Sequence, residues 1–223
     1  MTGEGFLPTR LTPWLWVGRA ADGHDMTWLQ KAGIERVYVI NCLDAGHAPR
    51  PRSLRPLRSH PPVEIVDYVA LNSQDTLQFP LFTAPLLADQ GTRSPKQARE
   101  TLWECVQRMM ARAHSEYYSD HKAFAKKTAA FIYCAAGLNR SATLAAAYVA
   151  LYGGHPLATV AAALKSARPG ALSNPAFVQQ LVRVVLGLDP DLGCAQEVVI
   201  SPKVLATGRR NAGGGPMFVR RSS

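Results

Sequence analysis

Short apolar runs alternate with longer segments of mixed apolar and polar residues along the chain, a pattern typical of alternating strands and helices. Two runs rich in β-branched and aromatic residues, 36–42 and 129–133, are too short for helices and predict buried central strands. Two further strands are predicted at 14–18 and 63–71. Helices are predicted at 25–32, 96–113, 141–152, 156–167 and 175–186, and residues 72–95 are expected to be irregular because prolines and a glycine interrupt them.

This order of elements predicts an α/β fold with a central, mainly parallel, twisted sheet flanked by helices on both faces. In such sheets a ligand binds at the carboxyl ends of the strands. A length of 223 residues with 47% hydrophobic residues is enough for one sizeable core. We therefore expect residues 11–187 to form one domain, with an N-terminal extension at 1–10 and a basic, Gly-rich tail at 188–223 that is partly disordered.

The four cysteines lie far apart and form no Cys-x-x-Cys pair, so the sequence predicts neither a zinc site nor a disulfide scaffold. No metal and no cofactor are expected. The sequence has no apolar run of the ~18 residues needed to span a bilayer, and residues 1–10 lack a signal-like apolar stretch. These features predict a soluble protein with reduced thiols in the cytoplasm, with the nucleus as a second location. The cysteines are Cys42, Cys105, Cys134 and Cys194.

The formal net charge of +9 predicts attraction to anionic partners, which include phosphoproteins, nucleic acids and acidic membranes. Much of this charge lies in 47–60 and 208–223, where no aromatic residues are interleaved, so nucleic-acid binding is only weakly indicated. The loop 47–60 is best interpreted as a solvated insertion, and a basic rim that attracts acidic or doubly phosphorylated peptides is the alternative. Its arginines are Arg50, Arg52, Arg55 and Arg58, and the flanking His47 and His60 lack metal-ligand spacing.

One segment carries a chemical pattern: Cys134 follows a predicted buried strand, and Arg140 opens the next helix after five intervening residues. A loop of this length can wrap its backbone N–H groups around a phosphate dianion, and the helix N-terminus adds its positive dipole end. The same field favours the nucleophilic thiolate of Cys134. Gly137 lets the loop curl, Arg140 can grip two phosphoryl oxygens, and the Ser141 hydroxyl can donate a hydrogen bond to the sulfur as it leaves. The predicted phosphate-binding residues are Ala135, Ala136, Gly137, Leu138, Asn139 and Arg140.

A Cys-x5-Arg spacing alone would match many chains by chance, but its strand, loop and helix context is more specific. The segment 133–143 resembles the signature of dual-specificity protein phosphatases, especially their small, atypical members, within the cysteine-based protein tyrosine phosphatase superfamily. Segments 14–18, 32–41 and 174–181 resemble the opening strand, the second strand and the closing helix of that family. The resemblance covers residues 11–186 in order and implies a catalytic domain with a protein-tyrosine-phosphatase-like fold.

The resemblance implies a role for an aspartate on a mobile loop, which protonates the leaving hydroxyl and then takes a proton back from water. Asp75 aligns with that position, whereas Asp67 lies within a predicted strand and is a poorer candidate. The family also has a histidine directly before the nucleophile, where this chain has Tyr133. A phenol donates one hydrogen bond but carries no positive charge, so slower turnover is one expectation. Some superfamily members place a second cysteine where Cys42 lies, although core packing is the favoured interpretation of Cys42.

The implied reaction is dephosphorylation of phosphotyrosine and of phosphoserine or phosphothreonine on proteins through a cysteinyl-phosphate intermediate. Ala135, Ala136, Leu138 and Asn139 are uncharged, whereas the superfamily's lipid 3-phosphatases place lysines in this loop, so phosphoinositide is disfavoured. Two alternatives stay open. One is a pseudophosphatase that binds phosphoproteins without turnover, and the other is an RNA 5′-phosphatase. The sequence leaves the oligomeric state open.

Overall fold

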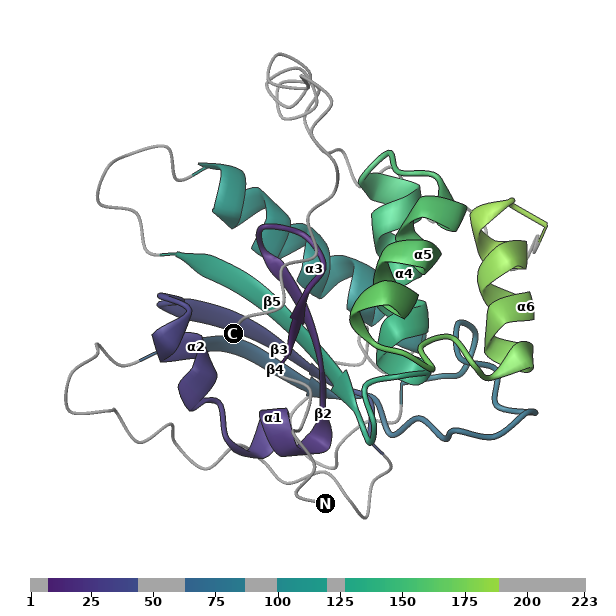
Figure 1. Ribbon diagram of the computed structural model, residues 1–223, viewed down its shortest axis with the longest axis horizontal. Helices are drawn as coiled ribbons and strands as arrows, with labels where there is room; N and C mark the ends of the chain where they lie inside the picture. The colour runs from purple at the N-terminus through teal and green to yellow at the C-terminus, as the bar shows by residue number, and fades with distance from the viewer. Residues whose placement is uncertain (1–7, 44–62, 87–99, 120–126, 189–223) are drawn as a thin grey trace.

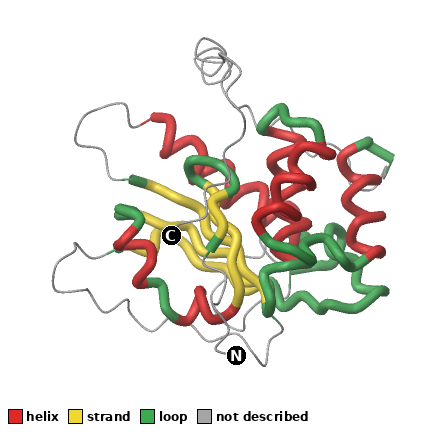
Figure 2. The backbone as a smooth tube through the Cα atoms, viewed as in Figure 1, coloured by secondary structure: helices red, strands yellow, loops and turns green. Residues whose placement is uncertain are grey.

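The computed structural model describes residues 8–43, 63–86, 100–119 and 127–188. They form a five-stranded sheet with the order β1-β2-β5-β3-β4, in which only β1 is antiparallel to its neighbour (Figures 1 and 2). The mainly parallel α/β architecture predicted from the sequence is therefore confirmed. The strands are β1 (Thr9–Arg10), β2 (Leu15–Arg19), β3 (Arg36–Asn41), β4 (Glu64–Ala70) and β5 (Thr128–Cys134).

Helices cover both faces of the sheet (Figure 1). On one face pack α3 (Leu102–Ser119), α4 (Arg140–Tyr152), α5 (Leu157–Ala167) and α6 (Pro175–Val185). The short α1 (Ala20–His24) and α2 (Thr27–Lys31) cover the other face. Every residue of β5 is buried, as expected for the central strand of a sheet covered on both sides.

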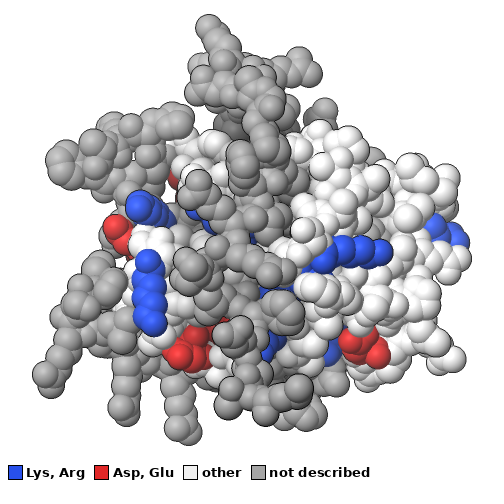
Figure 3. Space-filling model, in the orientation of Figure 1, with Lys and Arg blue, Asp and Glu red and all other residues white. Residues whose placement is uncertain are grey.

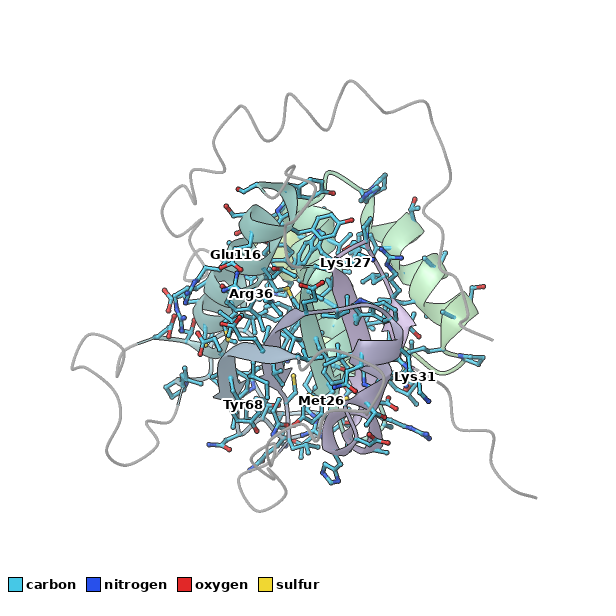
Figure 4. All side chains as sticks on the ribbon, turned by 90° about the vertical axis from the view of Figure 1, so that its left-hand side faces the viewer. Met26, Lys31, Arg36, Tyr68, Glu116 and Lys127 are labelled. Carbon is cyan, nitrogen blue, oxygen red and sulfur yellow. The ribbon has the colours of Figure 1, made fainter. Side chains whose placement is uncertain are left out.

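Alternation along β5 decides which face each of its side chains meets. Ile132 and Cys134 belong to the larger core under α3–α6, whereas Phe131 and Tyr133 belong to the smaller core under α1 and α2. Figure 4 shows Met26 and Tyr68 on the side of this smaller core and the Arg36–Glu116 ion pair, 2.7 Å long, on the α3 side. Consecutive residues of the signature, Tyr133 and Cys134, therefore lie in different environments.

The prediction of a helix at 96–113 is wrong at both ends, because α3 starts at Leu102 and continues to Ser119. Thr101 caps the start: the Glu104 N–H donates to its hydroxyl, and its own N–H donates to the Glu104 carboxylate at 2.7 Å. This reciprocal pair is a capping box, and Thr-x-x-Glu is its sequence signature. The last turns are held by aromatic packing of His114 on Trp14 and Tyr118, which a local pattern does not reveal.

Two short elements were not predicted. Thr9 and Arg10 pair with β2, so the sheet begins two residues before the predicted domain start at residue 11. The five-residue α1 contains Asp22 and Gly23, both poor helix formers, which explains the lack of a sequence signal. The other strands and helices lie within one to two residues of their predicted ends. The predictions for 87–95 and for the tail after 188 lie outside the described residues.

Charged side chains on the face shown in Figure 3 are dispersed, with acidic groups among the Lys and Arg side chains. On this face the described residues therefore form no continuous basic patch. Both Arg-rich segments noted in the sequence, 47–60 and 208–223, lie outside the described residues. Among the helices described, none is long and apolar enough to cross a membrane.

Candidate active site

The candidate nucleophile lies at the carboxyl end of the central strand. Cys134 ends β5, and Arg140 starts α4 directly after the loop 135–139. The Cys134 side chain is buried, and its Sγ accepts a hydrogen bond of 3.2 Å from the Ser141 hydroxyl. The signature thus has the strand, loop and helix arrangement that its spacing predicts, with the sulfur at the base of the loop.

Three carbonyl groups of the loop point outward and are hydrogen-bonded to neighbouring segments. The Ala135 oxygen accepts from the Ala20 N–H at 3.2 Å, and the Leu138 oxygen accepts from the Leu172 N–H at 2.8 Å. The Ala136 oxygen accepts from the guanidinium that follows α5, also at 3.2 Å. Because the C=O and the next N–H of a trans peptide point in opposite directions, these contacts turn loop N–H groups toward the interior. With the N-terminus of α4, this arrangement suits an anion.

Gly137 allows the loop to approach its neighbours closely. It has φ +69°, and a Cβ there would lie 2.6 Å from both the Gly18 carbonyl oxygen and the Nη2 atom of Arg168. Since both contacts are with groups fixed by other bonds, a side chain at this position would displace the loop.

We predict that Gly137→Ala lowers both phosphate binding and the free energy of unfolding. Left-handed backbone alone costs a non-glycine residue about 1–2 kcal/mol, and the two contacts add to that cost. The matched control is Gly154→Ala, because Gly154 has φ +68° but has no atom within 4 Å of its Cβ position. Thermal unfolding of both variants measures the difference. Equal destabilisation, with phosphate binding intact in both, would show that the loop tolerates a Cβ.

Arg140 is held beside the loop by backbone carbonyl groups from two other segments. It is 4% exposed, and its Nη1 donates to the Cys42 oxygen at 2.8 Å and to the Ser73 oxygen at 2.5 Å. The Ser73 hydroxyl donates to the same Cys42 oxygen at 2.8 Å. The end of β3 and the segment after β4 therefore fix the guanidinium beside the loop.

The structure brings Asp75 to the loop and keeps Asp67 away from it. The exposed Asp75 carboxylate accepts from the Asn174 amide at 3.1 Å and from the Asn139 amide at 3.4 Å. Asp67, on β4, instead forms ion pairs with Arg108 and Arg112 on α3, at 3.7 Å and 3.6 Å. Of the two carboxylates considered from the sequence, Asp75 alone contacts a loop residue through a described bond.

Asn174 was not predicted as a site residue. It caps the start of α6, where its side chain accepts from the N–H groups of Ala176 and Phe177. Its own N–H donates at 3.0 Å to Asn139, which also accepts from the Ser173 N–H. Asn before Pro is a sequence signal for a helix start, but the contact with Asp75 depends on residues 99 positions apart.

Tyr133 faces away from the side of the sheet that holds the Cys134 sulfur. Its ring stacks on Phe131 with a centroid distance of 5.3 Å, and a Cβ on Gly23 would lie 2.5 Å from the ring. Burial and the neighbouring Tyr68 hydroxyl raise the pKa of Tyr133 far above its usual value. Tyr133 is therefore neutral and supplies no charge to the site, as its residue type predicts.

Substituting Tyr133 with histidine tests this departure from the family pattern. We predict that Tyr133→His raises activity near pH 6 and moves the pH midpoint of Cys134 alkylation by iodoacetate downward, because a histidine adds hydrogen-bond support and, when protonated, positive charge. Alkylation is the cleaner measurement because the substrate phosphate itself ionises near pH 6. The Cys134→Ser variant corrects for other thiols. If the pH midpoint of alkylation is unchanged or higher in Tyr133→His, Tyr133 is instead a residue that packs against the α1 side of the sheet.

Cys42 lies directly after β3, the strand that pairs with β5. Burial raises the pKa of its thiol well above the usual value, with Cys134 adding to the increase and Arg140 opposing it. The thiol belongs to the larger core, which agrees with the packing role favoured from the sequence. Within the described ranges, no group of three or more His, Cys, Asp or Glu residues could hold a metal ion.

Comparisons with known proteins agree with this geometry. Residues 119–185 match the family model "Dual specificity phosphatase, catalytic domain". The crystal structure of DUSP15 superimposes with a TM-score of 0.53 at 23% identity, covering 83% of this chain and 91% of that chain. The human tyrosine phosphatase-like serine/threonine/tyrosine-interacting protein superimposes with a TM-score of 0.51 at 16% identity, covering 82% of this chain and 98% of that chain.

A third structure, the PTP-2 phosphatase of Cydia pomonella, gives a TM-score of 0.51 at 19% identity, covering 79% of this chain and 88% of that chain. A search of the curated proteins finds no match to the sequence. At these identities the superpositions show a common fold, and the family model covers the loop and α4–α6. Residues 119–185 therefore match the model of the dual specificity phosphatase catalytic domain, and the described part of the chain has the fold of the phosphatase structures compared with it.

Proposed function

We propose that this chain hydrolyses phosphate monoesters on tyrosine and on serine or threonine of proteins through a cysteinyl-phosphate intermediate. The observation that carries the proposal is the loop 134–140, with a thiol at its base, outward carbonyl groups and a buried arginine beside it. This combination places a nucleophile where an anion would be held.

In the first step the Cys134 thiolate attacks phosphorus, forming an S–P bond while the P–O bond to the leaving side chain breaks. The loop N–H groups and Arg140 hold the non-bridging oxygens as the phosphoryl group flattens. Asp75, protonated at this stage, gives its proton to the leaving oxygen. The products are the free hydroxyl side chain and the phosphoenzyme.

In the second step a water molecule attacks the phosphorus of the phosphoenzyme and the S–P bond breaks. The Asp75 carboxylate takes the proton of this water, which restores the acid for the next turnover. The Ser141 hydroxyl, already 3.2 Å from the sulfur, stabilises the thiolate that leaves. Inorganic phosphate is the second product.

Protein substrates are proposed because Ala135, Ala136, Leu138 and Asn139 add no cation that would meet further phosphates of a lipid headgroup. The assay compares phosphate release from matched phosphotyrosine and phosphothreonine peptides, a phosphoinositide and 5′-triphosphorylated RNA. The proposal expects release from peptides. Preferential release from RNA or lipid would contradict the substrate class.

A phosphoprotein-binding role without turnover is the second candidate, and the neutral Tyr133 is the observation that favours it. Binding of a phosphopeptide without measurable phosphate release from any substrate would identify this role. Release that requires Cys134 would exclude it.

We predict that Asp75→Asn reduces hydrolysis of phosphotyrosine and phosphothreonine peptides about 10²-fold, since an amide cannot protonate the leaving oxygen. Esters of acidic phenols, such as 4-nitrophenyl phosphate, should lose far less activity in the first step, because their leaving groups need no proton. Single-turnover release of the phenol separates this step. Asp67→Asn, on β4, is the matched control. If the rates of hydrolysis of both substrate classes decrease by the same factor in Asp75→Asn, another group is the acid.

A further inference from the structure

Arg168 is a buried arginine that directly follows α5 and contacts the loop from outside. It is 1% exposed, although arginine is rarely buried without partners. Its Nη2 donates to the Ala136 oxygen at 3.2 Å, and its Nη1 contacts the Thr9 hydroxyl at 3.4 Å. One guanidinium thus joins the loop to β1.

The two buried arginines lie on different sides of β5. Arg140 is held by Cys42 and Ser73, which follow β3 and β4, whereas Arg168 contacts Thr9 on β1. In the sheet order β1-β2-β5-β3-β4 these strands lie on opposite sides of β5. The 2.6 Å approach to a Cβ on Gly137 places the Arg168 guanidinium directly behind the loop.

Among the described residues, the charged and titratable groups around Cys134 include two buried cations, Arg140 and Arg168. Arg19 and Asp22, at the β2–α1 turn, lie 3.6 Å apart, and the Asp22 carboxylate also attracts Arg168. Cys42 and Tyr133 have raised pKa values and are neutral. Asp75 is exposed to solvent at the loop's outer edge.

Electrostatic coupling links Arg168 to the nucleophile. Burial lowers the pKa of Arg168, while the charges of Asp22 and Cys134 oppose this effect and Arg19 adds to it. Attraction between a guanidinium and a thiolate acts equally on both partners, so a fixed cation at this place favours the ionised sulfur.

We propose that Arg168 is a positioning residue of the active site, which holds the Ala136 carbonyl outside the loop and places a permanent positive charge behind it. This charge takes the part that a protonated histidine would play at position 133. The inference deepens the proposed function and rests on it for the reaction, but its two physical effects, on thiolate formation and on anion binding, exist without turnover.

The test measures iodoacetate alkylation of the Cys134 peptide against pH in the full-length chain, by mass spectrometry. Inorganic phosphate is then added, and the concentration that halves the alkylation rate reports anion binding. The variants are Arg168→Met, which removes the charge, and Arg168→Lys, which keeps the charge but loses the planar contact. Arg183→Met, at an exposed arginine on α6, is the control for net charge. Thermal unfolding verifies that each variant is folded.

Arg168→Met should raise the alkylation midpoint by about one pH unit, the lower end of the effect of a close opposite charge, and weaken phosphate binding about tenfold. Arg168→Lys should keep the midpoint near that of the wild type but weaken phosphate binding. The proposal would be overturned if the folded Arg168→Met variant kept both the alkylation midpoint and the phosphate affinity of the wild type. If that variant does not fold, wild-type phosphate binding in Arg168→Lys would overturn it.

Because the test does not rely on loss of turnover, the proposed function and the role of Arg168 can each be contradicted without the other. A wild-type chain that releases no phosphate, yet shows the Arg168-dependent midpoint, contradicts the proposed function alone. If Arg168→Met instead hydrolyses substrate at the wild-type rate and has an unchanged pH midpoint of Cys134 alkylation, the role of Arg168 alone is contradicted.

Discussion

Cys134→Ser should abolish phosphate release while phosphopeptide binding persists. A serine hydroxyl is not ionised near neutral pH, whereas the loop N–H groups and Arg140 that hold the anion remain. Loss of a nucleophile that works with its partners as a unit costs at least about 10³-fold in kcat. Steady-state phosphate release and calorimetric titration with a non-hydrolysed phosphopeptide analogue measure the two effects on the same preparation.

Cys105→Ser is a suitable control for this substitution, because Cys105 is also a buried thiol but lies on α3, outside the loop. Its activity should stay near the wild-type value if the variant is folded. Substantial residual hydrolysis in Cys134→Ser would exclude Cys134 as the nucleophile, and loss of both binding and turnover would point to collapse of the loop.

Arg140→Lys should lower kcat/KM about 10²–10³-fold, the usual cost of removing one donor that stabilises transition-state charge. An ammonium group keeps the charge but cannot form the paired contact with two phosphoryl oxygens. In arginine one nitrogen reaches the Cys42 and Ser73 carbonyl groups, whereas a lysine whose nitrogen reached them would have no second nitrogen for the anion. Both binding of inorganic phosphate and turnover should therefore weaken.

The charge-matched control is Arg183→Lys on α6, whose kinetics should equal those of the wild type. Comparison of kcat and KM for both variants, with unfolding temperatures, separates a local from a global effect. Wild-type behaviour of Arg140→Lys would mean that the loop does not hold phosphate through this side chain.

The part of the site that is local in sequence could be predicted. Cys134, Gly137, Arg140 and Ser141 follow one another along strand, loop and helix, so their spacing fixes their relative positions. The parallel sheet followed from short buried runs separated by helices. Asp75 was found through a resemblance, because its own neighbours carry no signal of proximity to the loop.

The outer support of the loop could not be predicted, because it depends on contacts between distant segments. Arg168 lies 32 residues after Ala136, and nothing in its flanking sequence indicates that it is buried. Thr9 reaches the same guanidinium from 159 positions away. The opposite orientation of Tyr133, by contrast, follows from strand alternation and could have been derived from the sequence.

The most direct test of the proposed mechanism is to trap the phosphoenzyme. Asp75→Asn is mixed with 4-nitrophenyl phosphate, whose leaving group needs no acid, and is quenched in acid within the first turnover; the missing base should slow hydrolysis of the intermediate. Mass spectrometry of the peptide that contains Cys134 should show the added mass of one phosphoryl group, absent in a variant that also carries Cys134→Ser. Release of the phenol without a phosphorylated Cys134 peptide would contradict covalent catalysis by this residue.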